Sequence, residues 1–140
     1  GLACAADIVL AADDAFFYEP FAGIALVPDG GNTLFIPRAA GRMRALSMML
    51  LGEKIDARDA CDWGLVWAVH PAKMLLAEAR ATADRVAALP PLAAQRTKQL
   101  VSAATDDALD AQLDLERDYQ AELSSTPEMI AAVSKFLGRT

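Results

Sequence analysis

A Pro-Asp-Gly-Gly turn at residues 28–31 constrains the fold of this chain more than any other feature. It follows an apolar run at 23–27 and precedes a helix-like run that begins at Asn32. Two consecutive glycines allow backbone conformations that other residues avoid, so the chain can change direction sharply here. The turn therefore predicts a carboxylate, that of Asp29, held at the edge of a packed core. The same four residues also suit an ordinary turn or helix cap.

Length and composition favour one domain and exclude several kinds of function. A chain of 140 residues can bury one sizeable core, and no apolar run reaches the roughly 18 residues of a membrane span. With 13 basic and 19 acidic residues, nucleic-acid binding is not expected, because neutralising phosphates needs clustered Lys and Arg.

Cysteine and histidine usage bears on metals and location. Cys4 and Cys61 match no metal or redox spacing, and the single histidine, His70, excludes a two-histidine metal site. We therefore expect a protein of a reducing, cytoplasmic compartment with no metal, no nucleic-acid partner and no membrane partner.

Apolar periodicity predicts an α/β fold in two parts. Residues 1–70 alternate short strands with helices, and residues 71–140 carry helical periodicity alone. Extended segments are predicted at 7–12, 15–18, 23–27 and 65–69. Helices are predicted at 32–40, 42–51, 57–63, 71–89, 91–104, 109–123 and 127–138. Residues expected to be buried include Trp63, Trp67 and the stripe Leu76, Ala79, Ala83 and Val86, with His70 in a loop.

Several motifs, in order, resemble the enoyl-CoA hydratase/isomerase (crotonase) superfamily: residues 2–12, 23–31, 36–42, 51–57 and 63–66. The similarity covers nearly the whole chain and corresponds to about the C-terminal half of such an enzyme. It implies a partial crotonase-like fold, with 1–70 as the later part of the α/β core. Residues 71–140 would then be a helical tail that covers coenzyme A and joins subunits into a trimer or a dimer of trimers.

Within the superfamily the chain looks most like the isomerases of phenylacetyl-CoA ring epoxides, on residues 17–22, 26–31, 64–67 and 111–120. The resemblance implies a coenzyme A thioester as substrate and no separate cofactor. Such enzymes stabilise a thioester enolate with two backbone N–H groups, an oxyanion hole. By the family pattern both donors would precede Gly1.

The resemblance also implies which carboxylates would act. Hydratases similar to this chain use two glutamates, at the positions of Gly1 and Phe21, and neither residue here is a glutamate. Glu19 lies two residues before the second position. In the isomerase branch the acid/base resembles Asp29, which would move a proton between two carbons.

Further residues would surround the substrate. The apolar side chains expected to line a pocket beside Asp29 are those of Phe17, Phe21, Ile24 and Phe35. Lys135 and Phe136, near the end of the chain, would cover the adenine end of coenzyme A. A basic group of Arg38, Arg42 and Arg44 would attract coenzyme A phosphates or form a solvated helix face.

Two readings of the function follow. The first is an acyl-CoA isomerase, of an epoxyphenylacetyl-CoA or of an enoyl double bond, of which these 140 residues are the C-terminal half. The second is a non-catalytic remnant or oligomerisation module, and an enoyl-CoA hydratase with an unusual site is a further alternative. Without an oxyanion hole, these residues alone are expected to show no useful turnover.

Overall fold

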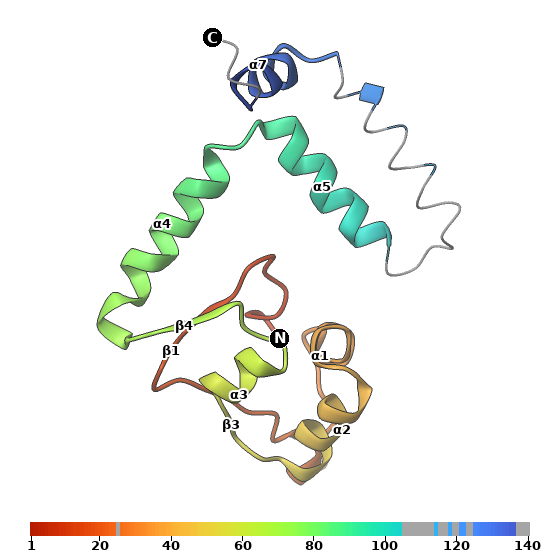
Figure 1. Cartoon of the computed structure of the whole chain (residues 1–140). Coiled ribbons are helices and arrows are strands. Elements are labelled where there is room, and N and C mark those ends of the chain that lie inside the picture. The colour runs from red at the N-terminus through yellow and green to blue at the C-terminus, as the bar shows by residue number, and fades with distance from the viewer. Residues whose placement is uncertain (25, 105–113, 115–117, 119–120, 123–124, 137–140) are drawn as a thin grey trace. The chain divides into compact units, whose positions relative to one another are not determined.

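The computed structural model describes residues 1–24, 26–104, 114, 118, 121–122 and 125–136 (Figure 1). It divides into two compact units, residues 1–80 and 81–140. The first unit combines short strands with helices, and the described elements that begin in the second are helices. The α/β fold class predicted from the sequence is therefore confirmed. In the part of the chain that is described, no helix is both long and apolar enough to cross a membrane.

Two pairs of short strands lie in the first unit (Figure 1). Strand β1 (Leu10–Ala12) pairs in parallel with β4 (Ala68–His70). Strand β2 (Phe16–Phe17) pairs antiparallel with β3 (Ile55–Asp56). Strands β1 and β2 follow each other closely but each pairs with a distant segment. These long-range pairings bring residues 55–70 back onto the beginning of the chain.

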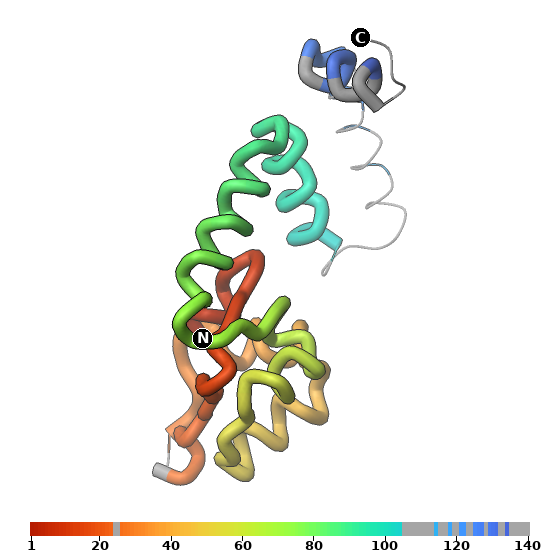
Figure 2. The backbone as a smooth tube through the Cα atoms, turned by 60° about the vertical axis from the view of Figure 1, so that its left-hand side comes forward, coloured from red at the N-terminus to blue at the C-terminus, as the bar shows by residue number. Residues whose placement is uncertain are grey.

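The helices agree closely with the periodicity. Their bounds are α1 (Asn32–Ala40), α2 (Arg42–Leu51), α3 (Ala57–Asp62), α4 (Leu75–Ala87), α5 (Pro91–Ala103) and α7 (Pro127–Phe136), with 3-10 helices η1 (Phe21–Ile24) and η2 (Ala72–Met74). Figure 2 shows the chain reversing direction between α4 and α5, where Pro90 and Pro91 begin the second of these helices. The helix predicted at 109–123 lies outside the described residues, apart from a few isolated positions.

Two extended segments were predicted wrongly. The strand predicted at 23–27 is absent from the described residues of that range: residues 23 and 24 belong to η1, and the backbone N–H of Leu26 donates to the Phe21 carbonyl at 2.9 Å. The strand predicted at 65–69 lies at 68–70, because the N–H groups of Leu65 and Val66 both donate to the carbonyl of Ala60 (2.9 and 3.2 Å). These bonds close the end of α3 before the chain can extend.

Several side chains expected in the core are exposed. Trp67 is 76 % exposed, although its backbone N–H donates to the Val9 carbonyl at 2.7 Å. Leu76 and Val86, on the apolar stripe of α4, are also exposed. Residue His70 ends β4 and does not lie in a loop. The stripe on α4 was therefore predicted wrongly as buried, although Leu76 and Ala79 line a cavity together with apolar residues of the first ten.

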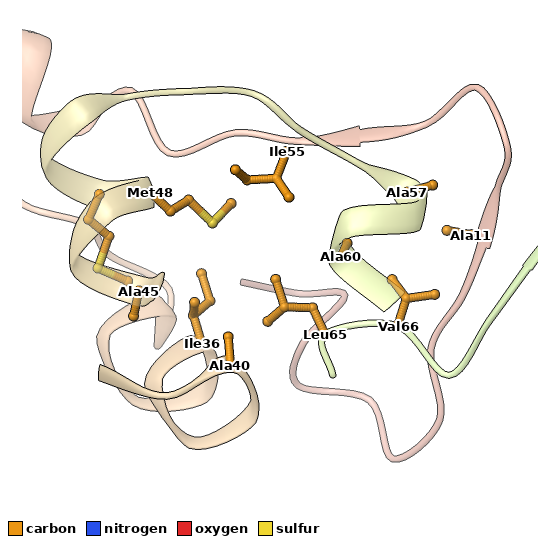
Figure 3. Packing of buried hydrophobic residues seen from close by; sticks show 11 residues of the cluster. Ala11, Ile36, Ala40, Ala45, Met48, Ile55, Ala57, Ala60, Leu65 and Val66 are labelled. Atoms are coloured by element: carbon orange, nitrogen blue, oxygen red, sulfur yellow. The ribbon is translucent and has the colours of Figure 1, made fainter. Parts of the chain in front are cut away.

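The core of the first unit lies between α1, α2 and α3 and the strands β1 and β3 (Figure 3). Its buried members are Ala11, Ile36, Ala40, Ala45, Met48, Met49, Ile55, Ala57, Ala60, Leu65 and Val66. Ala57 and Ala60 are completely buried, so α3 can approach its neighbours closely. Ile36 and Met48 are the largest fully buried side chains. This core fixes α1, the helix that the Asp29 turn leads into.

Asp56 caps α3, and we expect its removal to destabilise the fold. One carboxylate oxygen of Asp56 accepts hydrogen bonds from the backbone N–H groups of Arg58 (2.9 Å) and Asp59 (2.8 Å). Replacing Asp56→Ala should lower the free energy of unfolding by about 1 kcal/mol, because both donors lose their acceptor. Urea unfolding measures the change. The control Asp56→Asn keeps a capping oxygen and should stay near the wild type, and equal stability of all three proteins would refute the cap.

Candidate active site

The turn predicted at residues 28–31 is present. Gly30 and Gly31 have φ angles of 58° and 82°, in the left-handed region that favours glycine. A Cβ on Gly31 would lie 2.5 Å from the Phe35 ring, which leaves no space for a side chain. The backbone N–H of Asn32 donates to the Asp29 carbonyl at 3.0 Å. Asp29 is therefore an exposed carboxylate on a turn that leads directly into α1.

A buried carboxyl–amide pair lies next to this turn. Glu19 and Asn32 are each only 5 % exposed, and Nδ2 of Asn32 donates to Oε2 of Glu19 at 3.1 Å. The other polar atom of this amide, Oδ1, is buried and has no hydrogen-bond partner among the described residues. In the sequence, Glu19 stands out only by its distance from a hydratase position, and no motif indicates Asn32. No local signal marks either residue as buried.

The surroundings of Glu19 favour its neutral, protonated form. Burial raises the pKa of the Glu19 carboxyl above its usual range, and the negative charge of Asp29 adds to the increase. The last effect means that Glu19 and Asp29 are close enough to interact electrostatically. Two carboxyl groups from different segments, one buried and one exposed, thus belong to one site.

Gly1 packs against the same pair. A Cβ on Gly1 would lie 2.6 Å from Oδ1 of Asn32 and 3.0 Å from the carbonyl oxygen of Gly30. A side chain at this position would therefore have to displace a buried amide. The finding matters because the family resemblance places one hydratase glutamate at Gly1. Here the space next to Gly1 is occupied by Asn32.

The predicted apolar pocket is only partly visible. The ring of Phe35 lies against Gly31, and Phe17 is half-buried in β2 against the core. Phe21 is half-buried at the start of η1, and Ile24 ends η1 with its side chain outside those described. The binding role of these four aromatic and aliphatic residues stays a prediction.

The other proposed binding residues lie on helices. Lys135 and Phe136 are the last residues of α7, and their side chains are outside the described part, so their role also stays a prediction. Arg44 places its guanidinium over the ring of Trp63, 5.5 Å from the ring centre. A stacked guanidinium in this position stabilises the surface of α2.

Two cavities in the first unit lie away from Asp29. One, of about 490 Å³, is lined by both cysteines and by Trp67. Burial raises the pKa of the Cys4 thiol, which keeps the thiol protonated and poorly nucleophilic. The other, of about 430 Å³, is lined by apolar residues between Ala3 and Leu10 and at the start of α4. Asp7 also lines the first cavity, so a carboxylate and two thiols share it, and no residue of the Asp29 turn lines either cavity.

Comparison with known proteins assigns the class. The family model described as Enoyl-CoA hydratase/isomerase matches residues 1–140, so the chain belongs to the enoyl-CoA hydratase/isomerase family. The resemblance inferred from the motifs is thereby confirmed.

The relatives show how much of a family member is present. The chain is 39 % identical over 138 residues to 1,2-epoxyphenylacetyl-CoA isomerase of Escherichia coli (strain K12), a match to 99 % of this chain and 53 % of that protein. It is 35 % identical to 2,3-dehydroadipyl-CoA hydratase of the same organism, over 97 % of this chain and 53 % of that protein. The crystal structure of an enoyl-CoA hydratase/isomerase from Cupriavidus metallidurans CH34 superposes with a TM-score of 0.93 at 34 % identity, over 99 % of this chain and 52 % of that one. The chain thus spans about half the length of the relatives it matches.

Proposed function

We propose that the protein to which this chain contributes is an acyl-CoA isomerase with Asp29 as its acid/base. The observation that carries this proposal is the packing around Gly1, because Asn32 occupies the space that a hydratase glutamate would need. Phe21 stands at the second hydratase position, so Asp29 is the exposed carboxylate left at the site. The 39 % identity to an epoxyphenylacetyl-CoA isomerase supports the same choice.

The chemistry needs one carboxylate that can reach two carbons. Asp29 would take a proton from the carbon next to the thioester carbonyl, and the electrons of that C–H bond would pass into the enolate. The proton would then return to the carbon two positions further along, which shifts the double bond without changing the formula. Two backbone N–H groups outside this chain would hold the enolate oxygen. Coenzyme A would enter only as part of the substrate.

A hydratase with an unusual site is the second candidate. Glu19 and Asp29 interact electrostatically, and two carboxyl groups are what the hydratases of this family use to add water. Hydratases also occur among the relatives. Burial of Glu19 and its bond to Asn32 disfavour this candidate, because a general base must reach the water that it activates.

Product mass separates these candidates. The full-length protein is incubated separately with a 3-enoyl-CoA, a 2-enoyl-CoA and the ring epoxide of phenylacetyl-CoA. The mass of each product is measured by mass spectrometry. An isomerase converts the first or third substrate without a change in mass. Conversion of 2-enoyl-CoA alone, with the gain of one water, would contradict the proposal. A folded protein that converts none of them would be the non-catalytic module instead.

The coding sequence upstream of Gly1 gives an independent test. An open frame that encodes a glycine-rich segment able to form an oxyanion hole supports an enzyme. A stop codon immediately upstream would support the remnant.

A further inference from the structure

The Glu19–Asn32 pair has an unsatisfied acceptor. Nδ2 of Asn32 donates to Oε2 of Glu19 at 3.1 Å, whereas Oδ1 of Asn32 is buried without a donor among the described residues. An unpaired buried polar atom costs about 1–3 kcal/mol. A buried carboxylate supported by one neutral donor is costly as well. One change removes both costs, namely a proton on Glu19.

The number of hydrogen-bond donors on Glu19 decides whether Oδ1 of Asn32 can be satisfied. An ionised carboxylate can only accept hydrogen bonds, so it cannot satisfy Oδ1 of Asn32. A protonated carboxyl group has one O–H donor in addition to its carbonyl oxygen. Such a group and a primary amide can form two hydrogen bonds in a closed ring. The amide N–H donates to the acid carbonyl, and the acid O–H donates to the amide oxygen.

We propose that Glu19 is protonated in the folded enzyme, donates to Oδ1 of Asn32, and through this ring positions the Asp29 turn. Glu19 is then a positioning residue for Asp29 and does not touch the substrate. The effect on turnover rests on the proposed function, whereas the protonation of Glu19 does not.

The path from Glu19 to Asp29 is short. Asn32 is the first residue of α1, and its backbone N–H donates to the Asp29 carbonyl at 3.0 Å. Between them lie Gly30 and Gly31, which supply conformational freedom and no stiffness of their own. The buried ring therefore ties the flexible end of the turn to the segment between β2 and η1. Without it, Asp29 would sample several positions.

The surrounding charges are consistent with a neutral Glu19. Two titratable side chains among the described residues interact with it: the Asp29 carboxylate and the thiol of Cys4. A second carboxylate beside Asp29 would repel it, and a proton on Glu19 removes this repulsion. Burial of the Glu19 carboxyl favours the proton as well and is the largest of these effects.

Variants of Glu19 in the full-length enzyme test the positioning role. Glu19→Gln keeps both hydrogen bonds, because its amide can donate to Oδ1 and accept from Nδ2 of Asn32. We expect its kcat to stay within about threefold of the wild type, while Glu19→Ala lowers kcat on the order of 10²-fold with little change in KM, as expected for a misplacement of about 1 Å. The exposed glutamate variant Glu53→Gln is the matched control. A loss in Glu19→Gln as large as in Glu19→Ala would overturn the positioning role.

A spectroscopic measurement tests the proton without reference to activity. The infrared difference spectrum between wild type and Glu19→Gln at neutral pH should contain the carbonyl band of a protonated carboxylic acid. Carboxylate bands in its place would overturn the inference, even if Asp29 proves to be the acid/base. If the acid band is present and Asp29→Asn keeps full turnover, the proposed function fails and the Glu19–Asn32 ring stands.

The pH dependence of stability has a definite sign. A raised pKa of Glu19 means that the folded state binds this proton more tightly than the unfolded state does. The resulting stabilisation is complete below the ordinary glutamate pKa of about 4.3 and is lost as the pH rises through the raised value. The free energy of unfolding of the wild type, minus that of Glu19→Gln, should therefore fall with rising pH. A constant difference between the two proteins would contradict a shared proton.

Discussion

Asp29→Asn in the full-length enzyme is expected to lower kcat for isomerisation by about 10³-fold or more and to leave thioester binding nearly unchanged. General acid–base catalysis contributes roughly 10² to 10⁴-fold in most enzymes, and here one carboxylate would perform both proton transfers. An amide of the same shape cannot accept and return the proton. The turn itself should persist, because asparagine also tolerates turn conformations. Isomerisation is measured from the rate of product formation, and thioester binding is measured by calorimetry.

A matched control shows whether the loss of turnover is specific to Asp29 or follows from removing any surface carboxylate. Asp14 is an exposed turn aspartate between β1 and β2, so Asp14→Asn makes the same chemical change away from the site. Its kcat should equal that of the wild type. Unchanged turnover in Asp29→Asn would show that Asp29 serves only the structure of the turn and is not the acid/base.

Ile36→Ala is expected to lower the free energy of unfolding by about 2–5 kcal/mol, the largest stability effect that we predict. Ile36 is 2 % exposed and lies one turn after Asn32 on α1, where it anchors the helix to the core (Figure 3). Truncating it removes buried apolar surface and leaves a cavity in a close-packed cluster. Because α1 carries Asn32, the Asp29 turn should loosen together with the helix.

Urea unfolding of the wild type, Ile36→Ala and Leu34→Ala measures this loss of stability. Leu34→Ala is the matched control, since Leu34 is on the same helix but 45 % exposed. We expect the control to lose far less stability than Ile36→Ala. Similar losses in both variants would show that α1 is not fixed by the core described here.

Features with local causes were predictable from the sequence. Glycines with positive φ end the turn and α2, and an aspartate side chain caps α3. Pro90 and Pro91 mark the start of α5 in the expected place. The family motifs were equally local, so the fold class and the family followed from short segments of sequence. Asp29 could be singled out for the same reason.

Features that depend on distant contacts were not predictable. The partners of β1 and β2 lie about 40 residues or more away, and no local pattern specifies them. Trp67 was expected in the core because of its size, yet its side chain is exposed. The burial of Glu19 and Asn32 arises only when three segments meet, since both residue types usually lie on the surface. The sequence therefore indicated the Asp29 turn, whereas only the structure shows the buried pair of Glu19 and Asn32.

The most direct test of the account compares two changes from carboxyl to amide in one assay. Asp29→Asn and Glu19→Gln of the full-length enzyme are assayed with the same 3-enoyl-CoA, and thioester binding is measured in parallel. We predict that Asp29→Asn binds the thioester but loses turnover, while Glu19→Gln retains both. The reverse result, full turnover in Asp29→Asn and none in Glu19→Gln, would contradict the account.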